Sequence, residues 1–174
     1  FSCQHRHQAT NGGYKMMAGQ GRSDTIDVTH YTISLDISDL SSGEIHGNCE
    51  LKVVSLLNNL TTINLDLKAL TVDSVKVNGA ARTFTHTGEL LAISTPALNA
   101  NDTAIVTVYY GGAPVTDPSG FGGFYMTNTY AYNIGVAFAD DPHNYGRVWF
   151  PCPARSSRIG CRHNSRRRPS SDVS

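Results

Sequence analysis

Strict alternation of apolar and polar side chains is the feature that most constrains the fold of this chain. Residues 31–38 place Tyr, Ile, Leu and Ile at every second position, and residues 44–53 repeat the pattern with another apolar set. A period of two residues gathers the apolar side chains on one face of a strand, whereas a helix requires a period near 3.6. The turn-forming residues 39–43 separate the two runs, so we predict that they pair as an antiparallel hairpin.

Shorter runs of the same kind follow, and no segment keeps a sustained helical period. Asn78-Gly79 lies after one of them, and this dipeptide is the strongest short signal of a hairpin turn. The spacing predicts an all-β fold, either an antiparallel multi-strand sandwich or a saddle-like relative of it. The further strands are expected at residues 63–67, 72–77, 83–86, 90–94, 104–110, 124–126, 129–138 and 147–150.

The 174 residues are enough for one domain with flanking segments. We expect residues 1–24 to form a flexible lead, residues 25–152 the β-domain, and residues 153–174 a disordered, Arg-rich tail with few aliphatic side chains to bury. A shifted reading frame would produce the abrupt change in composition after residue 152. The first residue, Phe1, favours a fragment or a processed product, and no apolar run is long enough to predict a membrane span.

The charge of the chain is unevenly distributed, although its formal net charge is zero. Residues 23–146 contain 13 acidic side chains and four basic ones, while the basic excess lies in the two terminal segments. An acidic body repels the phosphate backbone. We therefore expect no nucleic-acid partner.

The known motifs of self-contained active sites do not occur in the sequence. It contains no HExxH, no GxSxG and no GxxxxGK[ST], so we expect no catalytic residue in this chain. The four cysteines have no CxxC spacing, which excludes a zinc ribbon and a thioredoxin-type motif. Cys3, His5 and His7 carry zinc-ligand chemistry, but three residues on a flexible lead do not complete a site, so we expect no bound metal or other cofactor.

One segment concentrates side chains that can bind ligands or take part in catalysis. Residues 140–152 read DDPHNYGRVWFPC and bring Asp, His, Tyr, Arg and the single Trp of the chain into thirteen positions. In one interpretation the segment is a turn followed by a last strand, with Trp149 and Phe150 filling the core. In the other it is a loop at a binding mouth, since polar groups on a loop held by a rigid sheet often contact a ligand.

The same segment resembles the end of the N-terminal domain of the M1, or aminopeptidase N-like, zinc metallopeptidases, in which an Arg-x-x-Phe-Pro-Cys run closes the first β-domain. Arg147, Phe150, Pro151 and Cys152 match this run. The resemblance extends over residues 24–152. The sequence of its last segment is most similar to a bacterial branch of the family. The other matching segments are Val28-Thr29-His30-Tyr31, Gly43–Val53, Leu65-Asp66-Leu67, Val75-Lys76-Val77-Asn78-Gly79 and Gly123-Phe124-Tyr125.

The resemblance implies a non-catalytic domain that packs on a zinc-containing catalytic domain. That domain and its zinc belong to a parent enzyme. This chain resembles a family member that is truncated before the catalytic domain. The family's N-terminal domain supplies one Gln or Glu to the amine of the substrate peptide. The corresponding position falls at Ala139 or Asp140, so Asp140 is the candidate substrate-binding residue, meeting the peptide N-terminus in the parent enzyme.

A stand-alone β-sandwich that binds or adheres to a ligand such as a carbohydrate is the alternative function. It predicts a row of exposed aromatic side chains, for which Tyr125, Tyr130 and Tyr132 are candidates. For either function, the bacterial cell envelope or secretion is favoured over the cytoplasm as the location.

Overall fold

The computed structural model describes residues 25–141 and 143–153, and within them the chain is entirely of β-type apart from one 3-10 helix. Every strand pairing is antiparallel, so the predicted all-β class is confirmed. The elements are β1 (Ile26–Asp36), β2 (Ile45–Ser55), β3 (Leu60–Asp66), β4 (Thr71–Val77), β5 (Ala80–Arg82), β6 (Phe84–Thr87), β7 (Leu90–Leu98), β8 (Thr103–Gly112), β9 (Gly123–Met126), β10 (Ala131–Ile134) and the helix η2 (Gly146–Val148).

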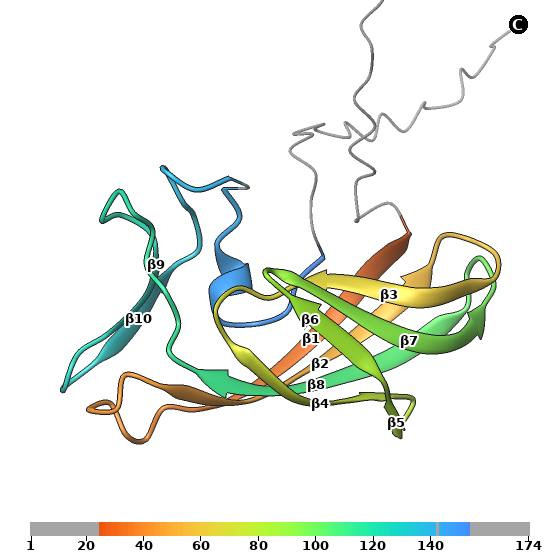
Figure 1. The fold of residues 1–174 in the computed structure, drawn as a ribbon, viewed down its shortest axis with the longest axis horizontal. Coiled ribbons are helices and arrows are strands. Elements are labelled where there is room, and N and C mark those ends of the chain that lie inside the picture. Colours follow the sequence, from red (N-terminus) through yellow and green to blue (C-terminus); the bar gives the residue numbers. More distant parts are fainter. Residues whose placement is uncertain (1–24, 142, 154–174) are drawn as a thin grey trace, which may run out of the picture.

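Two sheets form the body of the molecule. The larger has the order β1-β2-β8-β4-β5 and the smaller the order β3-β7-β6 (Figure 1). The predicted hairpin of the first two strands is confirmed, with Ile33 opposite Cys49. Asn78 and Gly79 join β4 to β5 with φ angles of 51° and 79°, the left-handed backbone that this turn requires.

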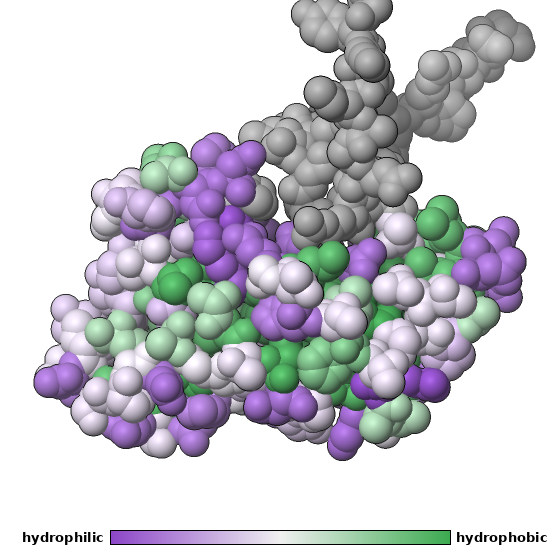
Figure 2. All heavy atoms as spheres, in the orientation of Figure 1, coloured by the Kyte–Doolittle hydropathy of each residue, from purple (hydrophilic) through white to green (hydrophobic). Residues whose placement is uncertain are grey.

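The hydrophobic core lies between the two sheets. Alternate side chains of β2 and β8 face inward and meet those of β3 and β7 from the other side. Viewed from the side of Figure 1, apolar residues gather in a band through the middle of the molecule, with hydrophilic residues along its lower margin (Figure 2). The fully buried members include Ile45, Leu51, Val53, Ile63, Leu65, Leu91, Ile93, Val106 and Val108.

A separate two-stranded ribbon, β9–β10, lies at one end of the body, and the segment containing η2 runs between this ribbon and β3 (Figure 1). The last described residues return to the body, because the backbone of Cys152 exchanges two hydrogen bonds with that of Asp66, at 2.7 and 3.0 Å. Gly122 allows the ribbon to approach the following loop, since a Cβ there would lie 2.0 Å from the carbonyl oxygen of Val136.

One of the predicted strands is wrong and another is too long. Residues 147–150 are not a strand, because Arg147 belongs to η2 and its side chain is drawn into buried polar contacts. The strand expected over residues 129–138 is limited to β10, since residues beyond Ile134 leave the ribbon to form a loop. The core-filling interpretation of Trp149 and Phe150 is confirmed in part, as both are half-buried against the core.

The lead and tail predicted at residues 1–24 and 153–174 lie outside the described residues except for Pro153. Over residues 25–141 and 143–153, no helix is long and apolar enough to cross a membrane.

Candidate functional site

A cluster of five polar side chains forms where the end of β3, the β6–β7 turn and the segment after β10 meet. We call it the Asp140 cluster; its members are Lys68, Glu89, Asp140, Tyr145 and Arg147. Two cations face two carboxylates, so the cluster is neutral overall. Its side-chain contacts join positions as far as 77 residues apart in the chain, since Lys68 Nζ lies 5.6 Å from the centre of the Tyr145 ring.

Arg147 is the buried centre of this cluster, with 1% of its surface exposed. Its Nε donates a hydrogen bond of 3.0 Å to Glu89 Oε2, and its Nη1 donates one to the carbonyl oxygen of Asn144. The guanidinium carbon also lies 5.1 Å from the centre of the Tyr145 ring, within cation–π range. A charge buried this deeply is tolerated only when it is paired and hydrogen-bonded, which these contacts achieve.

Asp140 is half-buried, and its described side-chain contacts all use Oδ2. This oxygen accepts hydrogen bonds from Lys68 Nζ and, at 3.1 Å, from the hydroxyl of Tyr145, and it lies 3.4 Å from Arg147 Nη2. Burial alone raises the pKa of this carboxyl, but the bonds from Lys68 and Tyr145 and the two positive charges outweigh it and hold the pKa below its usual value. Asp140 is therefore ionised at neutral pH.

Lys68 links the two carboxylates of the cluster, since its Nζ also lies 3.1 Å from Glu89 Oε1. Burial lowers the pKa of Lys68, but its bonds to Asp140 and Glu89 raise the pKa by more than burial lowers it, so the net shift is upward. Burial and the bond to Asp140 together raise the pKa of Tyr145. All these shifts favour the protonation states that hold the cluster together at neutral pH.

Asp140, Tyr145 and Arg147 belong to the segment singled out from the sequence, and the family resemblance made Asp140 the candidate; Lys68 and Glu89 were missed. Lys68 follows β3 and Glu89 lies in the turn between β6 and β7, where polar residues are common and carry no functional signal. Only the packing of the sheets brings them to Asp140. The two other Glu residues, Glu44 and Glu50, are exposed elsewhere on β2 and the turn before it. The other residue considered for the amine site, Ala139, is exposed beside Asp140.

The metal ligands considered from the sequence, Cys3, His5 and His7, lie outside the described residues. Within the described part of the chain, no three His, Cys, Asp or Glu side chains are grouped so as to hold a metal ion. Cys49 and Cys152 are both buried, and burial raises the pKa of the Cys49 thiol to about 12. Such a thiol is inert at neutral pH.

The β9–β10 ribbon carries a stack of tyrosine side chains. Tyr125 and Tyr132 are cross-strand partners whose ring centres lie 4.8 Å apart at an interplanar angle of 8°, and Tyr130 lies 6.0 Å from Tyr132. Phe121 and Phe138 form an edge-to-face pair at 5.3 Å. Tyr130 and Phe138 are 55% and 63% exposed. Of the three tyrosines expected to be exposed in a binding module, Tyr130 and Tyr132 are exposed and Tyr125 is half-buried.

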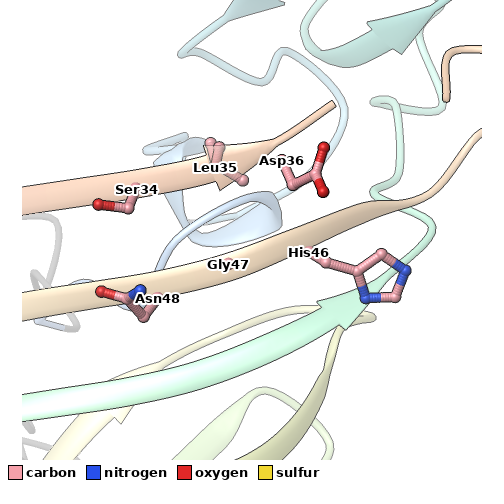
Figure 3. A pocket seen from close by; sticks show the side chains of 6 residues that line it. All are labelled: Ser34, Leu35, Asp36, His46, Gly47 and Asn48. Carbon is pink, nitrogen blue, oxygen red and sulfur yellow. The ribbon is translucent and has the colours of Figure 1, made fainter. Parts of the chain in front are cut away.

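A shallow hollow of about 380 Å³ lies away from this cluster, where β1 ends and β2 begins (Figure 3). Ser34, Leu35 and Asp36 line it from β1, and His46 and Asn48 from β2, on either side of Gly47. The two strands approach closely here, because a Cβ on Gly47 would lie 2.1 Å from the carbonyl oxygen of Ser34. Its polar groups come from two adjacent strands only and do not enclose a ligand.

The fold matches that of part of several M1 zinc metallopeptidases. An M1 zinc metallopeptidase from Deinococcus radiodurans, solved with a bound Tyr-Ser-Ala substrate, superposes with a TM-score of 0.63 and 24% identity, over 76% of this chain and 30% of that one. Aminopeptidase A from Legionella pneumophila gives a TM-score of 0.55 and 19% identity, over 74% and 14%. Leukotriene A4 hydrolase from Saccharomyces cerevisiae gives 0.52 and 17%, over 75% and 21%.

These matches define the chain as an all-β domain of the kind found within M1 zinc metallopeptidases. The resemblance inferred from the sequence is confirmed at the level of the fold. The chain spans less than a third of the length of each of these enzymes. No protein-family model matches the sequence, and no curated protein matches it.

Proposed function

We propose that residues 25–152 are the non-catalytic N-terminal domain of an M1-type zinc aminopeptidase, packing on the catalytic domain and bordering the substrate amine. The distribution of exposed apolar side chains carries this proposal. Within the described residues, eight large hydrophobic side chains are exposed, and five of them fall between residues 121 and 138. Phe121 contacts Phe138, and Tyr130 contacts Tyr132. Exposed apolar side chains that gather in this way favour a surface that a partner covers. The five are Phe121, Tyr130, Tyr132, Val136 and Phe138.

Asp140 lies two residues after Phe138, the last of these exposed side chains, and has the charge needed to bind an α-ammonium group. A carboxylate accepts a charge-assisted hydrogen bond from such a group, which is stronger than a neutral one. Since the described contacts of Asp140 occupy Oδ2, Oδ1 is the acceptor for the substrate. Lys68 and Arg147 keep Asp140 ionised, but their positive charges also oppose the ammonium, so the attraction is weaker than for an isolated carboxylate.

The zinc of the parent enzyme belongs, in this proposal, to the catalytic domain, because the described residues offer no metal site. The part of this chain in the reaction is to bind and orient the peptide N-terminus. The chain by itself should retain no stoichiometric zinc after dialysis against a mild chelator and should not hydrolyse an aminoacyl anilide. One tightly held zinc per chain together with hydrolysis would contradict the proposal.

The role of Asp140 is tested in the full-length enzyme encoded at the locus of this chain. Asp140→Asn should lower kcat/KM for a free-amine peptide about ten- to a hundredfold, the range for loss of a charged hydrogen bond. The N-acetylated analogue should show no such decrease. Asp141→Asn, a change of the exposed neighbouring carboxylate, is the matched control. Unchanged rates for Asp140→Asn, or the lack of an HExxH-encoding sequence downstream in any frame, would refute the proposal.

A stand-alone binding or adhesion module is the second candidate, and the tyrosine stack favours it. Tyr125 and Tyr132 turn ring faces toward each other, which leaves the more exposed Tyr130 as the platform for a sugar ring. Saturable binding of an oligosaccharide by the isolated chain, abolished by Tyr130→Ser, would support the module. Oligosaccharide titrations without binding would leave the enzyme domain as the better account.

A further inference from the structure

Asp117 lies in the loop between β8 and β9 and joins that loop to the Asp140 loop. Its carboxylate accepts hydrogen bonds from three consecutive backbone N–H groups: Phe138 at 3.1 Å and Ala139 at 3.0 Å to Oδ2, and Asp140 at 3.0 Å to Oδ1. The hydroxyl and the backbone N–H of Ser119 donate to Oδ2 as well. One carboxylate thus receives five donors.

These donors explain how a carboxylate can be buried here with only 2% of its surface exposed. Burial of an ionised carboxyl is costly unless hydrogen bonds replace its water. Burial raises the pKa of Asp117, but the bond from Ser119 and those from the backbone of Ala139, Phe138 and Ser119 outweigh it and lower the pKa to about 2. The contact therefore requires the ionised form, which is present at all physiological pH values.

We infer that Asp117 is the positioning residue of the Asp140 loop: its carboxylate fixes the backbone of residues 138–140 and thereby directs the Asp140 side chain toward Lys68 and Arg147. The N–H of Asp140 is itself one of the three donors, so the bond to Asp117 and the contacts of the Asp140 side chain orient the same residue from two sides. The functional value of this orientation rests on the proposed role of Asp140 at the substrate amine.

The experiment measures the loop in the 174-residue chain, independently of any substrate. Asp117→Asn keeps the size of the side chain and removes its charge. Amide hydrogen exchange at Phe138, Ala139 and Asp140 should become at least about tenfold faster, since charged hydrogen bonds are lost. The pKa of the Asp140 carboxyl, followed by carbon NMR, should rise toward its ordinary value as its contacts with Lys68, Arg147 and Tyr145 loosen. A purely structural role would not move this pKa in a folded variant.

Asp39→Asn is the matched control, because Asp39 also accepts backbone N–H groups, from Ser41 and Ser42, in the exposed turn between β1 and β2. It should leave both readouts unchanged. If Asp117→Asn folds and both readouts stay at their original values, the inference is overturned. If Asp117→Asn does not fold, Ser119→Ala decides: a smaller change in the same direction supports the inference, and no change overturns it.

The outcome is separable from that of the proposed function. Suppose that amide exchange is faster in Asp117→Asn while kcat/KM of the enzyme is unchanged by Asp140→Asn. The positioning role of Asp117 would then stand, and the amine-binding role of Asp140 would be rejected. If amide exchange is unchanged in Asp117→Asn and Asp140→Asn lowers kcat/KM strongly, the amine-binding role of Asp140 would stand and the positioning role of Asp117 would be rejected.

Discussion

The sandwich (residues 25–112) and the polar end (residues 113–153) are held together by different forces. In the sandwich, nearly every fully buried side chain is aliphatic and faces the opposite sheet. In the polar end, the buried side chains include Asp117, Tyr145 and Arg147, and the backbone follows hydrogen bonds and ion pairs. Apolar burial is strong but non-directional, whereas hydrogen bonds fix distances and angles.

The difference teaches where function can reside in this fold. The sandwich supplies stability, and volume-conserving exchanges among its apolar side chains cost it little. The polar end holds a few groups in defined geometry beside exposed aromatic side chains, which is what recognition requires.

The largest effect is expected in the sandwich. Leu65→Ala removes a fully buried side chain from β3 and should reduce the free energy of unfolding by about 2–5 kcal/mol, the range for large-to-small core substitutions. Leu57→Ala, at a position 46% exposed, is the control and should change stability little. Urea unfolding measures both. Similar losses in the two variants would contradict the assigned core.

The next effect is expected at the centre of the Asp140 cluster. Arg147→Ala removes the cation that pairs with Glu89 and should cost about 1.5–3 kcal/mol, the range for hydrogen bonds to charged groups. Arg147→Lys keeps the charge but loses the planar fork, so it should recover only part of this loss. Thermal and urea unfolding check both variants. Full recovery with Lys would show that charge alone matters there.

Acid should act on the polar end through Asp117. Its pKa is lowered from 3.8 to about 2, so its contribution to stability is complete above pH 3.8 and is lost as the pH falls toward 2. Between these values the unfolded chain binds a proton that the folded chain does not. Asp117→Asn should therefore reduce proton uptake on unfolding by about one per chain. Unfolding curves over this pH range measure it, and an unchanged pH slope would contradict the prediction.

The smallest effect is expected on the outer face of the ribbon. Tyr130→Ser changes a residue that is 55% exposed and should alter the free energy of unfolding of the isolated chain by no more than about 0.5 kcal/mol. A larger loss in urea unfolding would mean that the tyrosine stack stabilises the ribbon rather than offering a surface to a partner.

The sequence was informative wherever one local period governs the structure. The alternation at residues 31–38 and 44–53 predicted β1 and β2 and their pairing, and Asn78-Gly79 predicted the β4–β5 turn. The same reasoning failed at residues 147–150, where apolar neighbours suggested a strand and buried polar contacts of Arg147 impose a 3-10 helix. Local patterns cannot report such contacts, because the partner Glu89 lies 58 residues away in the chain.

By itself, the sequence determined the all-β class, the main strands, the acidic character of residues 23–146 and the segment in which the polar groups gather. Each of these depends on neighbours along the chain. Only the tertiary structure decided that Lys68 and Glu89 join Asp140, that Asp117 fixes the loop carrying it, and that Phe121 packs against Phe138 of the same loop. The physical reason is that hydrogen bonds and ion pairs act over a few ångströms in space, and the packing of the two sheets sets which distant residues come within that range.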